Sequence, residues 1–400
     1  MSYLFLFNKN TFNDDISDWH TSGVTDMTGM FWSASAFNQP LSFDTSSVTN
    51  MANMFQRASE FNQHLSFDTS KVANMASMFQ GASAFNQPLS FDTSKVVSMA
   101  SMFKSASAFN QELSFDTSKV VNMNGMFHYA TAFNQEVSFD TSSVTDIGNM
   151  FFGVGNFDQP LNSFDTSKVV NMESVFHSAN DFNQPLNNWD TSRVTSMQNM
   201  FNMANIFNQP LDNWDTSKVT SMANMFSWAA YFNNDIAGWD TSSVTDMTQM
   251  FYKASEFNQP LSSWDTSSVT NMNYMFNGAT DFNQPLRKGG ASGVWLDKLA
   301  RDRSKTGMIE GVKESNVFVA VISPGYFGSQ YCCLEVHTAL KERKPIVVVW
   351  NQSKERVQNA LTLTLTLTLS VGATHWVPTQ VWSDPTIKIG QNVVRSSGRG

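Results

Sequence analysis

Apolar and polar positions alternate along most of the chain in a pattern that returns every 24 or 25 residues. A phenylalanine followed by Asn or Asp marks each return. A period of this length is typical of a solenoid, in which successive coils stack and shelter one another's apolar side chains. The marker pairs begin at residues 12, 37, 61, 85, 109, 133, 157, 182, 207, 232, 257 and 282.

One repeat shows how a coil is expected to be built. After Val48 the apolar residues follow at steps of 3, 3, 1, 3 and 3, which favours a short helix or 3₁₀ turn with one inward face. A short strand at Val48–Thr49 is expected before it. The apolar positions of this coil are Val48, Met51, Met54, Phe55, Ala58 and Phe61.

Two polar positions recur as regularly as the apolar ones. The Asn of each Phe-Asn pair is predicted to pass amide hydrogen bonds from coil to coil, with Asp158 as the one departure among the later repeats. The Asp of each Asp-Thr-Ser is predicted to accept the backbone N–H two residues later, helped by a Lys or Arg three residues on in several coils. A calcium ladder is the alternative, but one carboxylate per coil falls short of the six to eight oxygens calcium prefers.

The repeat resembles the BspA-like repeats of surface proteins over residues 1–286. The string from Trp264 to Ala279 reads Trp-Asp-Thr-Ser-Ser-Val-Thr-Asn-Met-Asn-Tyr-Met-Phe-Asn-Gly-Ala, the family pattern throughout. This resemblance implies about eleven full coils of a leucine-rich-repeat-like solenoid that serves adhesion or protein recognition. Met1 to Phe5 aligns with the second half of a repeat and is interpreted as a half-coil.

The two residues after each Met-Phe pair vary most within the repeat, so they are predicted to be exposed. Aromatic side chains there are candidate anchors for a protein ligand on one face of the solenoid. Neutral drift at a surface position is the alternative. The candidate binding residues are Trp32, Tyr129, Phe152, Trp228 and Tyr252.

A different composition begins after Leu286. Residues 287–293 have the composition of a flexible linker. Within residues 294–352 the pattern predicts strands at 294–297, 317–323 and 344–350 and helices at 306–315 and 330–343, an alternation that favours a parallel sheet. Residues 361–369 alternate Leu and Thr, a strand-like period within an otherwise irregular, low-complexity tail over residues 353–400.

Residues 294–352 resemble part of a TIR domain. Five stretches carry the likeness: Val294–Lys298, Gly307–Ser315, Ile322–Ser329, Tyr331–Val336 and Lys344–Ile346. The resemblance implies a flavodoxin-like fold, self-association and signalling. In some members it also implies cleavage of NAD, for which the family's catalytic carboxylate falls on Glu335. The first strand of the family has no counterpart before Val294, so the segment is expected to be incomplete.

Composition argues against nucleic-acid binding, a disulfide framework and a histidine metal site. The net charge is −9 and the pI is near 5.1, which disfavours nucleic acid, and charged residues make up only 15% of the 400. The two cysteines, Cys332 and Cys333, are adjacent and lie outside the repeats, so no disulfide framework holds the coils. The six histidines share no metal-site spacing.

No apolar run reaches the length of a membrane span, and the first seven residues form a poor signal peptide. These features favour a cytoplasmic protein; a cell-surface location is expected only if the start of the chain is truncated. The sequence therefore predicts a non-enzymatic recognition solenoid joined to a TIR-like signalling segment, without a cofactor. The alternatives are an NAD hydrolase that uses Glu335, with NAD as its substrate, and a surface adhesin.

Overall fold

The computed structural model describes residues 1–5 and 11–284, and beyond them the backbone of five strands. The chain divides into two units, one comprising Met1–Ser292 with Lys298–Arg301, and the other Gly293–Asp297 with Asp302–Gly400. The strands are β1 (Arg287–Lys288), β2 (Ser292–Gly293), β3 (Phe318–Ile322), β4 (Ile346–Trp350) and β5 (Leu363–Leu365).

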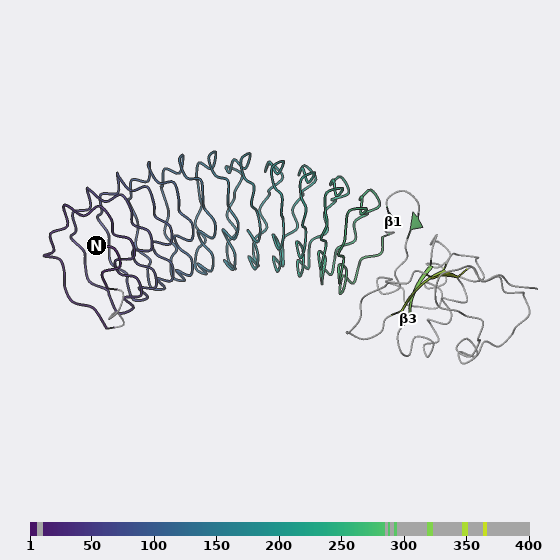
Figure 1. The fold of residues 1–400 in the computed structure, drawn as a ribbon, viewed down its shortest axis with the longest axis horizontal. Helices are drawn as coiled ribbons and strands as arrows, with labels where there is room; N and C mark the ends of the chain where they lie inside the picture. The colour runs from purple at the N-terminus through teal and green to yellow at the C-terminus, as the bar shows by residue number, and fades with distance from the viewer. Residues whose placement is uncertain are drawn as a thin grey trace, which may run out of the picture. The chain divides into compact units, whose positions relative to one another are not determined.

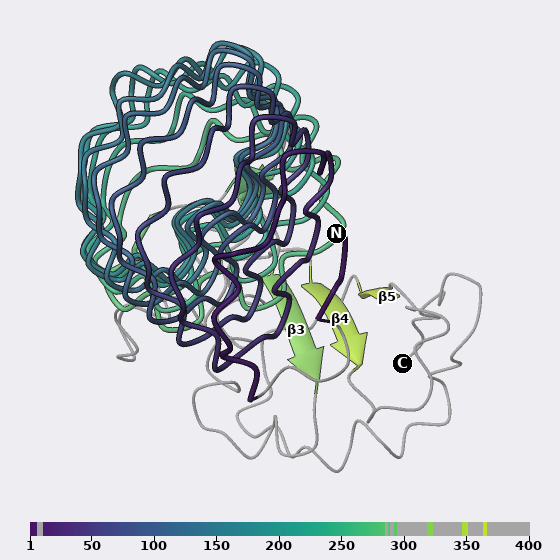
Figure 2. The same cartoon turned by 90° about the vertical axis from the view of Figure 1, so that its left-hand side faces the viewer.

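The repeats form a curved stack of coils that lie side by side, as predicted (Figures 1 and 2). Each coil contributes one residue to a column of parallel β-bridges, which begins with Asp26 and Asn50 and ends with Asp246 and Asn271. The strand expected at Val48–Thr49 is therefore reduced to a single bridge residue slightly later in the coil.

Of the two alternatives expected in each coil, the short helix is absent from the described coils. A series of tight turns takes its place, closed by i to i+3 bonds of the kind that a 3₁₀ turn makes. Two residues per coil, four positions apart, hold a positive φ, as Asn53 and Arg57 do at 59° each. A left-handed residue ends a right-handed helix, so the chain turns after each one. The residues between them close i to i+3 bonds, for example from the N–H of Met54 to the carbonyl of Met51 at 3.2 Å.

Alternate peptide groups in these turns point along the stack instead of closing turns. Their N–H groups donate to carbonyl groups of the next coil at 2.6 to 3.3 Å. Hydrogen bonds between coils therefore replace the bonds that a helix would make within one coil. In the coil after Asn50 the donors are Met51, Asn53, Phe55 and Arg57, and the acceptors are Asn74, Ala76, Met78 and Gln80.

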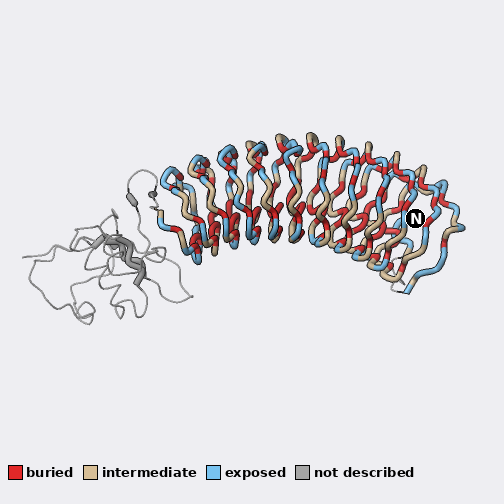
Figure 3. The backbone as a smooth tube through the Cα atoms, turned by 180° about the vertical axis from the view of Figure 1, so that it is seen from behind, coloured by how far each residue is buried: buried red, intermediate tan, exposed pale blue. Residues whose placement is uncertain are grey.

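The core is a set of side-chain columns that run the length of the stack, and Figure 3 shows the buried positions returning in each successive coil. Phe55 is fully buried, and its ring lies 5.6 Å from Phe79 in the next coil and 4.1 Å from Phe61 in its own coil. The rings are nearly parallel, with interplanar angles of 4° and 13°. Burial of these apolar surfaces and offset stacking hold the coils together.

Coils of 25 residues carry one more loop residue, and most of them carry a tryptophan before the recurring Asp. The indole N–H of Trp214 donates to the carbonyl of Leu186 at 3.0 Å, and Trp239 repeats this bond with Leu211. A buried indole requires such an acceptor. The extra residue thus accompanies a ring that both fills the core and bonds to the preceding coil.

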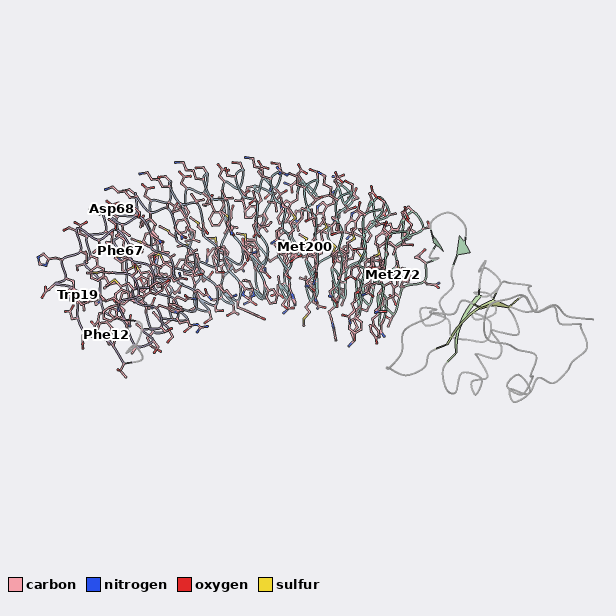
Figure 4. The ribbon with its side chains drawn as sticks, in the orientation of Figure 1. Phe12, Trp19, Phe67, Asp68, Met200 and Met272 are labelled. Atoms are coloured by element: carbon pink, nitrogen blue, oxygen red, sulfur yellow. The ribbon has the colours of Figure 1, made fainter. Side chains whose placement is uncertain are left out.

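Both predicted polar ladders are confirmed. The Oδ1 atom of Asn38 accepts hydrogen bonds from the backbone N–H of Asn62 at 2.9 Å and from Nε2 of Gln63 at 3.0 Å. The carboxylate of Asp68 accepts the backbone N–H of Ser70 at 3.0 Å. Hydrogen bonds from the Ser70 side chain and backbone lower the pKa of Asp68, and the charge of Lys71 lowers it further. Figure 4 places Asp68 at the outer edge of the stack.

In the second unit β3 lies parallel to β4, and β5 pairs with β4 in the antiparallel direction. The apolar runs at 317–323 and 344–350 therefore form the predicted parallel pair, and the Leu-Thr tract supplies the third strand. Within the segment expected to be a linker, β1 and β2 pair with each other. The strand predicted at 294–297 and the helices predicted around 306–315 and 330–343 lie outside the described residues.

Candidate functional site

The two residues that follow each Met-Phe pair form a continuous line along the stack, which we call the turn edge. In each coil the second of them has a positive φ, and in every coil before the last it donates its N–H to the carbonyl of the first one in the next coil, as Arg57 does to Gln80 at 2.6 Å. The backbone of the edge is thereby fixed. The turn edge comprises residues 32–33, 56–57, 80–81, 104–105, 128–129, 152–153, 177–178, 202–203, 227–228, 252–253 and 277–278.

Side chains at the left-handed position of the turn edge fall into two groups. In six coils this residue is Gly or Ser, and in five it is bulky. A bulky residue with positive φ is strained, since its Cβ crowds the neighbouring carbonyl. The five bulky residues are Arg57, Tyr129, Met203, Trp228 and Lys253.

Tyr129 and Phe152 meet in the middle of the stack. Their ring centroids lie 5.2 Å apart, and Phe152 also packs against His128 at 4.6 Å and His177 at 4.1 Å. Tyr129 is 47% exposed. Its ring lies over Gly153, where a Cβ would come within 2.3 Å of it, so glycine makes the space for this ring.

Trp228 and Tyr252 form a second cluster toward the C-terminal end of the stack. Their rings meet edge to face at 6.1 Å, and Nζ of Lys253 lies 3.7 Å above the Trp228 ring. Trp228 remains 46% exposed. The cation and the two rings are thus held in contact at the surface, a cation–π arrangement.

The five residues predicted to bind a ligand do not form one site. Trp32 lies in the first coils, where its ring packs against Tyr3 at 5.7 Å, apart from the other two clusters. The turn edge therefore presents separate aromatic sites along the stack.

Sequence reasoning missed three exposed apolar side chains near Trp228. They are Met203, Ile206 and Tyr231, which are 45%, 38% and 48% exposed. Ile206 and Tyr231 occupy the fifth position after the Met-Phe pair, where other coils carry Ala, Asn, Asp or Glu. The sequence did contain a signal for Ile206 and Tyr231, because each is a large apolar residue at a position that is small or polar in the other coils.

The turn edge carries no acidic residue, although residues 1–284 contain 26 Asp and Glu against 10 Lys and Arg. Its cations are Arg57, Lys104 and Lys253. Burial, with smaller effects from Lys104 and His177, lowers the pKa of His128 to about 4. Burial also lowers the pKa of His177. Histidine thus adds no charge to the edge near pH 7.

Glu335 lies outside the described residues. Within the described part of the chain, no group of three or more His, Cys, Asp or Glu side chains is arranged to hold a metal ion. The same residues contain no helix long and apolar enough to cross a membrane.

Comparison with known families accounts for both regions. The profile of the family described as "Mycoplasma protein of unknown function, DUF285" matches overlapping segments that together span residues 1–297. The chain belongs to the DUF285 family. BspA-like repeats fit this family, so the resemblance found in the repeat is confirmed. The matched segments are 1–114, 65–139, 113–213, 136–233 and 207–297.

A TIR domain profile matches residues 278–385. The match begins in the last coil and continues through the Leu-Thr tract, so it extends beyond the segment 294–352 on both sides. No curated protein and no solved structure matches the chain. This DUF285 protein thus combines repeats with a TIR domain.

Proposed function

We propose that the coil stack recognises a protein ligand through its turn edge and that the TIR domain converts this recognition into self-association and signalling. The observation that carries the proposal is the left-handed backbone of Arg57, Tyr129, Met203, Trp228 and Lys253. Gly or Ser would occupy these positions at a lower conformational cost, as in the other coils. Strain of this kind is found where a side chain serves a function other than stability.

The proposed ligand contacts the stack at the Tyr129–Phe152 and Trp228–Tyr252 clusters, and Trp32 forms a third contact. Aromatic side chains supply a large contact area and lose little conformational entropy, which suits them as anchors. The contact of Lys253 with Trp228 orders this cluster before a ligand arrives, and ordering in advance lowers the cost of binding.

The architecture that we propose for the two regions is a leucine-rich-repeat-like solenoid followed by a flavodoxin-like domain. One parallel bridge per coil and the continuous core support the first assignment. The parallel pairing of β3 with β4 supports the second, since flavodoxin-like sheets are parallel.

Paired substitutions test recognition at the turn edge. Proteins retained by the immobilised chain would be compared with those retained by a Tyr129→Gly, Trp228→Gly double variant. Each protein retained by only one of the two chains would then be purified, and its binding measured by calorimetry. The control is Val97→Ser, which changes an exposed apolar residue elsewhere on the stack. We expect the double variant, and not the control, to lose the ligand. Equal retention by all three chains would contradict the proposal.

The TIR domain is proposed to act without catalysis. Purified protein incubated with NAD is expected to release no nicotinamide, as measured by chromatography. Release that disappears in Glu335→Ala would instead establish the alternative, in which a carboxylate stabilises the positive charge that develops on the ribose. Release that persists in that variant would be assigned to a contaminating enzyme and would leave the expectation intact.

A further inference from the structure

Two adjacent coils in the interior of the stack expose four large apolar side chains. Met203 and Trp228 occupy the left-handed position of the turn edge, and Ile206 and Tyr231 follow three residues later in the same two coils. Each of the four is between 38% and 48% exposed. Among the described coils, only these two carry a large apolar residue at both positions. We call the four residues the apolar square.

Backbone hydrogen bonds hold the residues at the fifth position after the Met-Phe pair side by side. The N–H of Tyr231 donates to the carbonyl of Asn205 at 3.2 Å, and the fifth residues of the neighbouring coils make the equivalent bond. The resulting fifth-position column comprises Asp181, Ile206, Tyr231 and Glu256, and all four are exposed. An exposed carboxylate therefore lies in the coil on each side of the apolar square.

The spacing of these coils is close to that of the turns of an α-helix. Coils joined by parallel bridges lie about 4.8 Å apart along their backbones. The phenylalanines that directly follow the column, at 182, 207, 232 and 257, have ring centroids 6.0 to 6.2 Å apart. One helical turn rises about 5.4 Å, between these values, whereas side chains on one face of an extended strand return every 6.4 to 6.8 Å, or about one residue pair. A helix that lies along the stack can therefore place one side chain over each coil.

The charges around the apolar square favour a basic partner. At the left-handed and fifth positions of these four coils the one cation is Lys253, and its ammonium lies 3.7 Å from the centre of the Trp228 ring. Asp181 and Glu256 are the two anions. The repeats as a whole carry 26 acidic and 10 basic side chains over residues 1–284, so their field attracts a basic segment and repels an acidic one.

We propose that the protein ligand presents a basic amphipathic α-helix to this part of the stack, an inference that rests on the proposed function. The helix lies along the stack, and two apolar side chains on its central turns contact the apolar square. A Lys or Arg one turn beyond them at each end pairs with Asp181 or Glu256. Residues i, i+4, i+7 and i+11 share one face of a helix, so the partner carries basic, apolar, apolar and basic side chains at these positions.

Two pools of synthetic peptides test the chemistry of the partner. Each peptide is an Ala-rich helix of about 20 residues, long enough to form a helix in water. The basic pool has Lys or Arg at i and i+11 and Leu, Ile, Phe or Met at i+4 and i+7, and the matched acidic pool has Glu at i and i+11. We expect the immobilised full chain to retain members of the basic pool and none of the acidic pool. Fluorescence anisotropy of a retained, labelled peptide then gives its Kd.

Variants of the chain locate the contact. The double variant Ile206→Ala, Tyr231→Ala introduces the residue that four other coils carry at the fifth position, and it is expected to weaken binding of the retained peptide about tenfold or more. The double variant Asp181→Lys, Glu256→Lys is expected to retain the acidic pool in place of the basic one. The control is Glu60→Lys, a charge reversal at the exposed fifth position of an early coil, which should bind like the original chain.

Three results would overturn the proposal: retention of neither pool, unchanged binding by the double alanine variant, and a preference for basic peptides that survives the charge reversal. The proposed function fails separately. If proteins still require Tyr129 and Trp228 for retention while no helical peptide binds, the proposed function stands and the helical partner does not.

The unaltered chain gives a further measurement that needs no variant. Raising NaCl from about 0.05 to 0.5 M should weaken the basic peptide several-fold, because salt screens its contacts with the two carboxylates. A Kd that does not change with salt would contradict the proposed pairing. Circular dichroism of each variant would show that these exposed substitutions leave the stack folded.

Discussion

Two residues of every coil hold a positive φ, and the choice of side chain differs between them. Before the Met-Phe pair these residues are mostly Asn, Ser or Gly, which tolerate the left-handed region. After it they include Arg57, Tyr129 and Trp228, which do not tolerate it well. The left-handed backbone is therefore formed with little strain before the Met-Phe pair and with more strain after it. This difference distinguishes the turn edge from the other turns.

The cost can be measured at Arg57. Arg57→Gly should raise the free energy of unfolding by about 0.5 to 1 kcal/mol, since glycine adopts the left-handed region freely but loses more entropy on folding. The matched control is Lys71→Gly, which removes another exposed basic side chain where φ is not positive, and it should lower the same quantity. Urea unfolding gives both values. An Arg57→Gly chain less stable than the Lys71→Gly chain would refute the argument from strain.

The half-buried His128 should make the stability of the stack sensitive to acid. Because burial lowers the pKa of His128 to about 4 from 6.5, the unfolded chain binds a proton between these values that the folded chain does not. Stability therefore falls as pH falls through this window. We expect a loss of about 1 kcal/mol between pH 7.5 and pH 5.5, after allowance for partial exposure of the ring.

His128→Phe should remove most of that loss, since Phe152 already occupies the same position in the next coil. Urea unfolding at the two pH values measures the difference. The control is His20→Phe, which replaces an exposed ring in the first coil and should retain the original pH dependence. Equal pH dependence of the two variants would show that His128 is not the group responsible.

At the scale of the coil, the sequence predicted the period, the inward face and both polar ladders, because each depends on one residue type returning at one spacing. It left open whether each coil contains a short helix or a 3₁₀ turn, and it did not predict the left-handed residues that favour turns. Val48, Met51, Met54 and Ala58 have the spacing of a helix, and only Asn53 and Arg57, through their backbone, prevent one. Side-chain periodicity does not report φ, and Arg is not a residue type that indicates a left-handed turn.

The candidate site was predicted in part for the same reason. Variation at the turn edge pointed to Tyr129 and Trp228, which the structure leaves exposed, but it could not show that the aromatic residues fall into separate clusters. The clusters are separate because the aromatic residues lie in coils that are not adjacent. The sequence also could not show the contact of Lys253 with Trp228, which depends on a side chain reaching back across one coil.

The asparagine ladder predicts how substitutions at Asn110 change the stability of the stack. Oδ1 of Asn110 accepts from the backbone N–H of Asn134 at 2.9 Å and from Nε2 of Gln135 at 3.1 Å. Asn110→Leu leaves both donors without this acceptor and should cost about 1 to 3 kcal/mol. Asn110→Asp keeps it and should lie within about 1 kcal/mol of the original chain.

Asp158 is the natural precedent for the second substitution. Its carboxylate accepts from the N–H of Asn183 at 2.9 Å and from Nε2 of Gln184 at 2.9 Å, the same two bonds that asparagine makes in the other coils. Thermal unfolding of the two variants separates the outcomes. If Asp at position 110 proved as costly as Leu, the ladder would depend on the amide nitrogen rather than on the oxygen.

At the scale of the molecule, each coil contacts only its neighbours, so stability is carried by the interfaces between successive coils. The repeats and the C-terminal region also differ in charge: residues 1–284 have a net charge of −16 and residues 285–400 a net charge of +7. Acidic surface keeps a long stack soluble, because copies repel one another along their sides.

A stack held by neighbour contacts should separate at its weakest interface. Phe127 is fully buried in the middle of the stack and packs against Phe103, Phe133 and Phe151 at 5.8, 4.0 and 5.7 Å. Phe127→Ala should cost about 3 to 5 kcal/mol locally and uncouple the coils on either side, so that the two halves unfold at different urea concentrations. In a chain whose other seven tryptophans are replaced by phenylalanine, fluorescence of the core tryptophans at 189, 214, 239 and 264 reports the C-terminal half alone, while circular dichroism reports both halves. The fluorescence and circular dichroism transitions should diverge in Phe127→Ala. They should coincide in the control, Phe276→Ala, which makes the same substitution in the last coil. Transitions that coincide in both variants would mean that the stack unfolds as one cooperative unit, with coupling that reaches beyond neighbouring coils.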